Sequence, residues 1–542
     1  MTDSASPGAT TTAPVTGAAG NRPATGATAA APPTGAAGNG SATVRENAMP
    51  HTGSAPHDGR STNRWLVLII ACLAQFMVVL DATVVNVALP SIQRGLHFSP
   101  ASLQWVVNAY TLIFGGFLLL GGRAGDLVGR KRLFMIGVVL FSGASLLNGL
   151  AQSSGMLIVG RGLQGLGGAL LSPAALSIIT TTFVDQGERT KALGVWSAIA
   201  AGGGAVGLVL GGALTQLASW PWIFFVNVPV GVATLLLTLR FVPESRADFQ
   251  HRAFDVAGAV TVTAGLVVLV YAIVKAQAYG WGSGRTIGLI VVAVILLAAF
   301  VAIERRSVAP LIRLSIFRVK TLAVANGVLL LVASGMFGMF FFASLYVQEI
   351  LGYSPLHAGL AFLPVTGGIV VGAGLAQPLV RSLGARNVGV IGIVLATAGM
   401  VVLAQVPVHG SYVSDLLPGL LPLSIGMGLV FVPITLMATG GVERNDAGLA
   451  SGLFNTAQQV GGSLGLAILS TLAASKTTSV LTGAHGAASA TAVTAAKVSG
   501  YHVAFIAAAI MLAAGALILA TAVRRRDLEK LSVELAPSAA AA

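Results

Sequence analysis

Long apolar segments alternate with short polar ones from residue 65 to residue 523. Many of them are about 18 residues or longer, which lets a helix cross a hydrocarbon core of about 30 Å. Backbone groups in lipid must bond within their own element, and barrel strands would give short alternating runs, so the pattern predicts helices. We place fourteen spans at 65–88, 101–121, 133–152, 156–181, 192–216, 222–242, 255–274, 286–304, 321–347, 357–380, 387–406, 413–438, 447–473 and 501–523.

The composition excludes a water-soluble protein. Of the 542 residues, 55% are hydrophobic and only 9% are charged, and the mean hydropathy is +0.84. Soluble domains carry about a quarter charged residues. The single cysteine, Cys72, lies inside the first span, so an intrachain disulfide is impossible.

Two segments outside the spans have a composition typical of disorder. Residues 1–63 are almost entirely Ala, Gly, Thr, Pro and Ser, which offer too little bulky apolar surface to offset the entropy of ordering. We expect a disordered tail there and, for the same reason, a mobile loop over 477–499. A removable signal sequence is not expected, because the first apolar run begins only at Trp65.

The distribution of Lys and Arg predicts the orientation, because short cytoplasmic loops carry an excess of these residues. With the N-terminus in the cytoplasm, cytoplasmic segments hold 25 of the 31 basic residues. Five lie in outer segments: Arg94, Lys275, Arg285, Lys476 and Lys497. We therefore predict two cytoplasmic termini in a bacterial inner membrane. The net charge of +13 follows from this topology, so a nucleic-acid partner is not expected.

Two charges fall inside predicted spans, where each costs a few kcal/mol unless a partner or a water cavity compensates it. Asp81 lies near the outer end of the first span, and Arg161 lies near the outer end of the fourth. At about 1.5 Å per residue both are about 8–12 Å below the outer surface, so they meet if their helices are neighbours. Gln164 shares the helical face of Arg161 and can bond Arg161 or its partner, with a neutral packing amide as the alternative.

A buried pair of this kind is suited to carrying a proton. Exclusion of water favours the neutral carboxyl group, whereas a neighbouring guanidinium favours the carboxylate. Arginine stays protonated in practice, so Asp81 is the expected proton carrier, coupled to helix position through Arg161. A static ion pair that fixes helix packing is the alternative.

Glycines and charges recur in a set order after the first span. The loop after the second span carries Gly122, Asp126, Gly129, Arg130 and Lys131. Glycine permits a tight turn between two helices, and the basic cluster anchors the cytoplasmic side. The fifth span carries Gly194, Gly203, Gly207, Gly211 and Gly212. For the first set, a turn that only carries the positive charge of the cytoplasmic side is the alternative explanation. For the second set, the alternative is close helix packing by small residues.

Together with segments 80–90, 158–169, 222–231, 351–359 and 450–462, these motifs resemble the fourteen-helix drug:proton antiporter subgroup of the major facilitator superfamily. The resemblance covers residues 65–523. It links the arginine of the fourth span to proton transfer and the glycines of the fifth span to antiport. The chain departs from the family pattern at Ala124, Leu127, Leu208, Pro221 and Gln458.

The resemblance implies an all-α membrane protein with the major facilitator fold, in which an inserted two-helix hairpin joins two six-helix bundles. The expected parts are a tail at 1–63, a bundle at 64–243, the hairpin at 244–304, a bundle at 305–523 and a tail at 524–542. A substrate cavity between the bundles would open alternately to each side. The loop 122–132 would brace the bundles on the cytoplasmic face, with Asp126 and Arg130 as gate contacts.

Clues to the substrate come from the expected cavity lining, which is Asn86, Asn227, Met336, Phe340, Asn455 and Gln459. Met and Phe form a soft surface suited to varied apolar ligands, although lipid-facing or packing roles are an alternative. Asp81 is the only acidic residue placed well within a span, which argues against a site for dications. Amphiphilic, antibiotic-like compounds that are neutral or singly charged fit better.

We therefore expect a secondary transporter that exports such compounds in exchange for protons. Export or import of one endogenous metabolite, such as a siderophore, a peptide or a sugar, stays open, as does a non-transporting membrane sensor. Enzymatic activity, a metal and a cofactor are not expected, because Cys/His metal spacing and a phosphate-binding loop ending in Lys-Ser/Thr are missing from the sequence. The expected partners are a small-molecule substrate and membrane lipid, and the protein is expected to work as a monomer.

Overall fold

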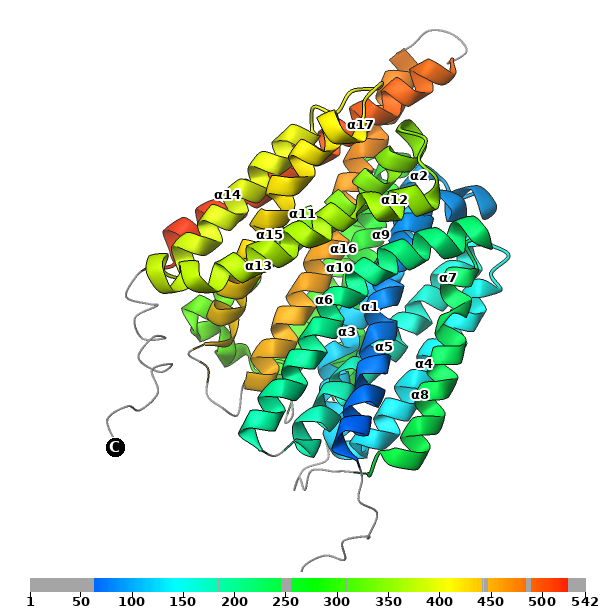
Figure 1. Cartoon of the computed structure of the whole chain (residues 1–542). Helices are drawn as coiled ribbons and strands as arrows, with labels where there is room; N and C mark the ends of the chain where they lie inside the picture. The colour runs from blue at the N-terminus through cyan, green and yellow to red at the C-terminus, as the bar shows by residue number, and fades with distance from the viewer. Residues whose placement is uncertain are drawn as a thin grey trace, which may run out of the picture. The chain divides into compact units, whose positions relative to one another are not determined.

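The computed structural model describes residues 63–183, 185–244, 255–307, 310–440, 442, 447–483 and 489–524, which belong to one compact unit. Within these ranges all regular secondary structure is helical (Figure 1). The two predicted tails lie outside the described residues, except for residues 63 and 524 at their inner ends.

The helices succeed one another without an intervening domain. The α-helices are α1 (Arg64–Gly95), α2 (Pro100–Leu103), α3 (Trp105–Val128), α4 (Arg130–Gly149), α5 (Ser154–Thr182), α6 (Gln186–Leu217), α7 (Trp222–Phe225), α8 (Asn227–Phe241), α9 (Val256–Tyr279), α10 (Gly284–Arg306), α11 (Lys320–Leu345), α12 (Pro355–Ala361), α13 (Leu363–Leu383), α14 (Ala385–Leu403), α15 (Leu417–Thr439), α16 (Ala447–Gly483) and α17 (Ala490–Ala522). A 3₁₀ turn, η1 (Leu314–Arg318), and two π-helical turns, η2 (Tyr346–Ile350) and η3 (Tyr412–Leu416), complete them.

The predicted helical spans are confirmed. Thirteen helical segments of the described chain are long and apolar enough to cross a membrane. The remaining predicted span, 192–216, lies in α6, whose apolar stretch is the shorter segment Gly202–Leu217. The predicted loop over 477–499 is wrong: α16 continues to Gly483 and α17 begins at Ala490. Alanine favours helix strongly, so a segment with few bulky apolar side chains can still be helical.

The first half of the unit packs around α5. Gly165 and Gly167 face different neighbours, and a Cβ built on Gly167 would lie only 2.6 Å from the backbone nitrogen of Phe141 on α4. Gly165 meets the backbone of Tyr110 on α3 in the same way. Because glycine has no side chain, α5 approaches α3 and α4 closely at these contacts. The packing of α1 against α5, α6 and α8 completes a bundle of six spans.

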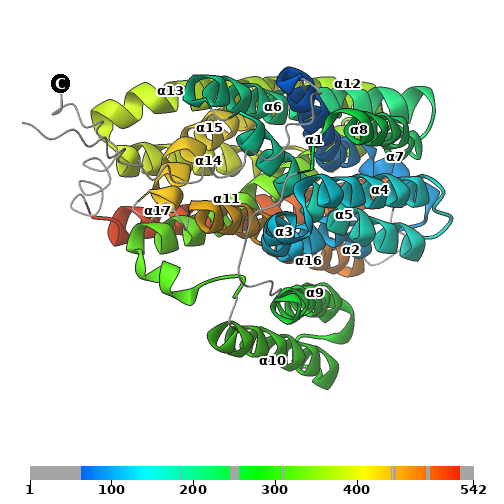
Figure 2. The ribbon, with the colours of Figure 1, turned by 90° about the horizontal axis from the view of Figure 1, so that it is seen from below.

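The second half is built from α11 to α17. The principal contacts join α11 to α16 and α17, α13 to α15, and α14 to α15 and α17. The helices α9 and α10 form a hairpin, and α9 lies against α3 of the first half and α16 of the second (Figure 2). Two six-helix bundles and an inserted hairpin are therefore the observed architecture, as predicted.

The bundles have two ends along the helix axes, which we call the proximal and the distal side. The proximal side is the one where α1 begins at Arg64, and the distal side is the one where α1 ends at Gly95. On the distal side α12 packs against the end of α6, which joins the two halves there (Figure 1).

Candidate functional site

The two charges predicted to lie within spans meet in the structure. The Nη1 atom of Arg161 on α5 lies 2.6 Å from Oδ2 of Asp81 on α1. The exposed fraction is 0% for Asp81 and 1% for Arg161, so water is excluded from the pair. Removing one partner of such a buried pair typically costs about 3–5 kcal/mol, because the other charge is left uncompensated.

Gln164 connects the two charged groups. Its Nε2 donates to Oδ1 of Asp81 at 2.8 Å, and its Oε1 accepts from Nη1 of Arg161 at 2.8 Å. Asn148 of α4 donates to the same Oε1 at 2.7 Å, which fixes the orientation of the Gln164 amide. Gln164 therefore contacts both partners, as the spacing on α5 predicts.

Asn227 belongs to this polar cluster rather than to the cavity where it was predicted. Its Nδ2 donates to Oδ1 of Asp81 at 3.3 Å and to Oγ of Ser145 at 3.1 Å. The short helix α7 ends just before Asn227, and Ser145 donates to the carbonyl oxygen of Phe224 in α7 at 2.9 Å. This contact fixes α7 against α4, and the chain turns Asn227 toward α1 instead of toward the other half.

Arg161 is held on its remaining sides by neutral groups. Its Nε donates to the carbonyl oxygen of Val106 at 2.9 Å, and its guanidinium carbon lies 4.4 Å from the ring centroid of Tyr110. A cation over an aromatic face is stabilised by about 0.5–2 kcal/mol, more when water is excluded. The position of the guanidinium is thus determined by α1, α3 and α5 together.

A cavity of about 320 Å³ lies beside this pair, between α1, α3 and α5 of the first half and α11 and α16 of the second. We call it the central cavity. Arg161 lines it, whereas Asp81 lies behind the guanidinium and does not. Of the six residues predicted to line a substrate cavity, five do so here: Asn86, Met336, Phe340, Asn455 and Gln459. That they bind substrate stays a prediction.

The glycines of the fifth predicted span lie on α6 with different surroundings. Gly203, Gly207 and Gly211 face α1, and a Cβ on Gly211 would lie 2.6 Å from Cγ2 of Val84. Gly212 faces the backbone of Pro355 in the second half, whereas Gly194 has no heavy atom within 4 Å of a built Cβ. Four of the five therefore serve close packing beside Asp81 or between the halves.

The loop between α3 and α4 turns at Gly129, whose φ of 110° is a conformation that side chains rarely adopt. Lys131 binds its own half: its backbone nitrogen donates to Glu244 Oε1 at 3.2 Å and its Nζ donates to the carbonyl oxygen of Leu239 at 3.2 Å. The side chain of Asp126 lies outside the described residues. A gate function for Gly122, Asp126 and Arg130 stays a prediction.

On the distal side, α11 and η2 bind the end of α1. Pro90 has no backbone N–H, so the carbonyl of Asn86, four residues earlier, has no helical partner. Ser344 donates its hydroxyl to that carbonyl at 2.7 Å, and Gln348 donates its amide to the carbonyl of Val87 at 2.8 Å. We call these two bonds the distal clasp, because they join one half of the unit to the other.

Four residues of the polar cluster and the distal clasp were not predicted from the sequence: Ser145, Asn148, Ser344 and Gln348. Ser145 and Asn148 are polar residues at i and i+3 within an apolar span, which is the signal that identifies them. Ser344 and Gln348 are likewise one helical turn apart, at i and i+4. Their acceptors are backbone carbonyl groups, however, and every residue has one, so the sequence does not identify them.

The two bundles, the spanning helices and the buried ion pair beside a cavity define a multi-pass helical membrane protein with a polar site at its centre. A family model described as Major Facilitator Superfamily matches residues 71–466, and the chain belongs to that superfamily. It is therefore a membrane transporter whose curated relatives include antibiotic resistance and export proteins.

Three of those relatives cover most of the chain. A puromycin resistance protein of Streptomyces alboniger is 42% identical over 85% of this chain and 90% of its own length. A cephamycin export protein of Amycolatopsis lactamdurans is 39% identical over 77% of this chain and 87% of its own. A tetracenomycin C resistance and export protein of Streptomyces glaucescens is 36% identical, over 78% of each.

Solved structures agree on the fold. A crystal structure of a bacterial homologue of the human lysosomal transporter Spinster has a TM-score of 0.60 at 17% identity, covering 87% of this chain and 99% of that one. A peptide transporter of the POT family gives the same TM-score at 18% identity, covering 85% and 96%. At such identities the likeness concerns the fold alone.

Proposed function

We propose that the protein exports small amphiphilic, antibiotic-like compounds in exchange for protons, by alternating access of the central cavity. The observation that supports the proposal most directly is the Asp81–Arg161 pair, which is excluded from water yet adjoins that cavity through Arg161. An ionisable group in such a position is expensive, and in a transporter it is expected to lie on the path of the coupling ion.

The geometry around Asp81 is that of a carboxylate. Every side chain that bonds it donates: Arg161 to Oδ2, and Gln164 and Asn227 to Oδ1. A proton on either oxygen would remove one acceptor site and the charge that balances the guanidinium. Protonation therefore weakens the contact between α1 and α5 and releases Arg161 toward the cavity.

This release couples the proton to the substrate. A bound amphiphile fills the central cavity and confines Arg161 against Asp81, and the guanidinium held there favours the carboxylate and loss of the proton. Once the substrate has left, water reaches Arg161, and a proton from the outer medium can be taken up by Asp81. Substrate and proton thus occupy the transporter alternately, which is the requirement for antiport.

In this proposal the proximal side faces the cytoplasm and both termini lie there. The bundles comprise residues 64–243 and 305–523, and the hairpin comprises 244–304. The distal clasp and the contact of Gly212 with Pro355 support a state that is closed to the outside. The loop 122–132 would brace the halves in the opposite state.

Two observations favour amphiphiles as substrates. The central cavity combines Met336 and Phe340 with the amides of Asn86, Asn455 and Gln459, and its described lining has no acidic residue. The names of the relatives, which refer to puromycin, cephamycin and tetracenomycin C, also favour antibiotic-like compounds. Transport of a single endogenous metabolite is the second candidate, because relatives named for one compound resemble the chain as strongly as multidrug ones.

Reconstituted vesicles bearing a pH gradient test the proposal. Wild-type protein is expected to move a neutral aromatic amphiphile against its concentration gradient, and Asp81→Asn is expected to lose this while retaining exchange at equal concentrations. Asp81→Glu, which preserves the carboxyl group, is the matched control. Gradient-driven export by Asp81→Asn at the wild-type rate would refute proton coupling through this residue.

A further inference from the structure

A second cavity lies on the distal side, and neither the proton site nor the central cavity accounts for it. It measures about 250 Å³ and is lined mainly by apolar side chains, among them Leu103, Phe341, Phe342, Leu345 and Tyr501. We call it the distal cavity. It differs from the central cavity in containing none of the residues of the Asp81 cluster.

The two cavities follow one another along the same three elements. On the α2–α3 segment the lining passes from Val107 to Leu103, on α11 from Phe337 to Phe341, and on α16 from Leu466 to Ser470. Each step is four residues, slightly more than one helical turn, or about 6 Å along the helix axis. The distal cavity therefore continues the seam between the two halves by one turn toward the distal surface.

The inserted hairpin covers the lateral side of this seam. Leu266, Val270 and Val274 of α9 pack with Leu112 of α3 and Ala467 of α16 in one apolar cluster. Gln277, one turn farther along α9, lines the distal cavity and donates to Thr478 of α16 at 3.4 Å. A molecule in the seam is thus separated from lipid by α9.

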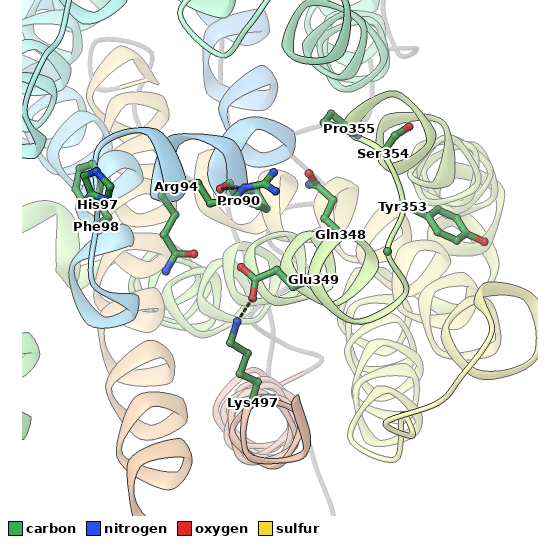
Figure 3. A pocket seen from close by; sticks show the side chains of 12 residues that line it. Pro90, Arg94, His97, Phe98, Gln348, Glu349, Tyr353, Ser354, Pro355 and Lys497 are labelled. Carbon is green, nitrogen blue, oxygen red and sulfur yellow. Dashed lines mark hydrogen bonds and ion pairs between the residues drawn. The ribbon is translucent and has the colours of Figure 1, made fainter. Parts of the chain in front are cut away.

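An ion pair lies between the cavity and the distal surface. Lys497 of α17 lies 2.7 Å from Glu349 of η2, and Tyr501 turns its hydroxyl toward the same carboxylate. Both members of the pair also line a third cavity of about 840 Å³, the distal vestibule, with Arg94 and Gln348 (Figure 3). Gln93, Glu349 and Lys497 belong to both linings, so the ion pair and Gln93 together separate the distal cavity from the vestibule.

We propose that the distal cavity is a second substrate subsite, which takes the apolar body of an uncharged amphiphile after it leaves the central cavity and before it enters the vestibule. The inference rests on the proposed function. The cavity volumes support it, since the central cavity of about 320 Å³ and the distal cavity of about 250 Å³ are similar enough to take the same apolar ring of the substrate. The aromatic lining suits a flat ring, and Gln93, Gln277 and the Glu349–Lys497 pair offer hydrogen bonds to polar groups at its edge.

Photoaffinity labelling tests the subsite directly. The probe is an uncharged naphthalene that carries a diazirine and a hydroxyl group, applied to the full chain in lipid nanodiscs, with labelled peptides mapped by mass spectrometry. We expect two labelled groups, one around residues 455–466 of α16 and one around 470–481 of α16 and 497–501 of α17. Excess unlabelled hydroxynaphthalene should compete with both.

Two substitutions on one turn of α16 provide the matched variants. Ala474→Phe fills the distal cavity, whereas Leu472→Phe enlarges an exposed side chain on the same helix that lines neither the distal nor the central cavity. We expect Ala474→Phe to abolish the distal label and preserve the central label. Export should slow about tenfold or more, which corresponds to an activation free energy of the exit step that is higher by about 1.4 kcal/mol. Leu472→Phe should behave as wild type.

The outcomes separate this proposal from the one before it. Distal labelling that unlabelled hydroxynaphthalene does not compete for would identify a lipid or structural cavity and overturn the subsite. If wild type exports the compound, two further results would also overturn the subsite. One is normal export by Ala474→Phe, and the other is labelling that is confined to the central cavity. Absence of export by wild type would overturn the proposed function itself, and the subsite with it.

Discussion

The distal clasp exists because of a proline, and this origin allows a quantitative test. Pro90 deprives the carbonyl of Asn86 of its helical donor, and Ser344, which is fully buried, supplies the replacement from the other half. Ser344→Ala leaves that carbonyl unbonded in the distally closed state, at a cost of about 1–3 kcal/mol. In a distally open state water supplies the bond, so the equilibrium should shift toward opening by about 5–150-fold.

A second substitution makes the prediction specific. Pro90→Ala returns an N–H to α1 and gives the carbonyl of Asn86 a donor within its own helix. In that background Ser344→Ala should change the equilibrium far less, so the two substitutions should show a coupling of at least about 1 kcal/mol in a double-mutant cycle.

Spin labels measure the equilibrium. Cysteines replace Gln93 on α1 and Tyr353 after η2, which are close to the distal clasp and on opposite halves, in a chain whose native Cys72 is changed to serine. Double electron–electron resonance then gives the fractions of closed and open molecules. Equal effects of Ser344→Ala in both backgrounds would refute the reasoning that the proline creates the clasp.

Three further predictions follow from the site. Gly211→Ala should lower the thermal stability and the yield of the protein, because its Cβ would lie 2.6 Å from Val84, whereas Gly194→Ala should be tolerated, since nothing lies within 4 Å of its Cβ; thermal unfolding of purified variants checks both. Arg161→Lys keeps the charge but loses the geometry that reaches Val106, Asp81 and Gln164 at once, so gradient-driven transport should fall about tenfold or more while expression persists; wild-type transport would contradict this. Asn227→Leu removes one hydrogen-bond donor to Asp81, which destabilises the carboxylate form by about 1–3 kcal/mol. Loss of the proton then requires a higher pH, so proton-driven export should be retained only at higher pH. An unchanged pH profile of export would show that Asn227 has no part in the proton site.

The sequence predicted the helices and the ion pair because both depend on strong, local physical constraints. An apolar run in lipid has few alternatives to a helix, and a charge within it has few alternatives to a partner at the same depth. With only Asp81 and Arg161 clearly within spans, their pairing required no knowledge of the remaining packing. Gln164 followed from its spacing on the same helix.

Where the sequence misled, the deciding information was three-dimensional. Asn227 was placed in the cavity by its position in a motif, but the break between α7 and α8 and the contact of α7 with Ser145 turn it toward Asp81. The predicted loop over 477–499 is wrong because a scarcity of bulky apolar side chains was equated with disorder, although alanine-rich helices continue beyond the apolar part of a span. The cavities and the clasp depend on contacts between the halves, which no single segment encodes.

In the proposed mechanism, substrate and proton occupy the protein alternately because Asp81 releases its proton when substrate binds. Proton release on substrate binding measures this directly, with purified protein in a weakly buffered solution containing a pH indicator and a neutral aromatic amphiphile added in excess. Wild type should release a proton when the amphiphile binds, and Asp81→Asn should bind the amphiphile without any release. Proton release by Asp81→Asn equal to that of wild type, or binding to wild type with no release at any pH between about 5 and 9, would contradict this mechanism.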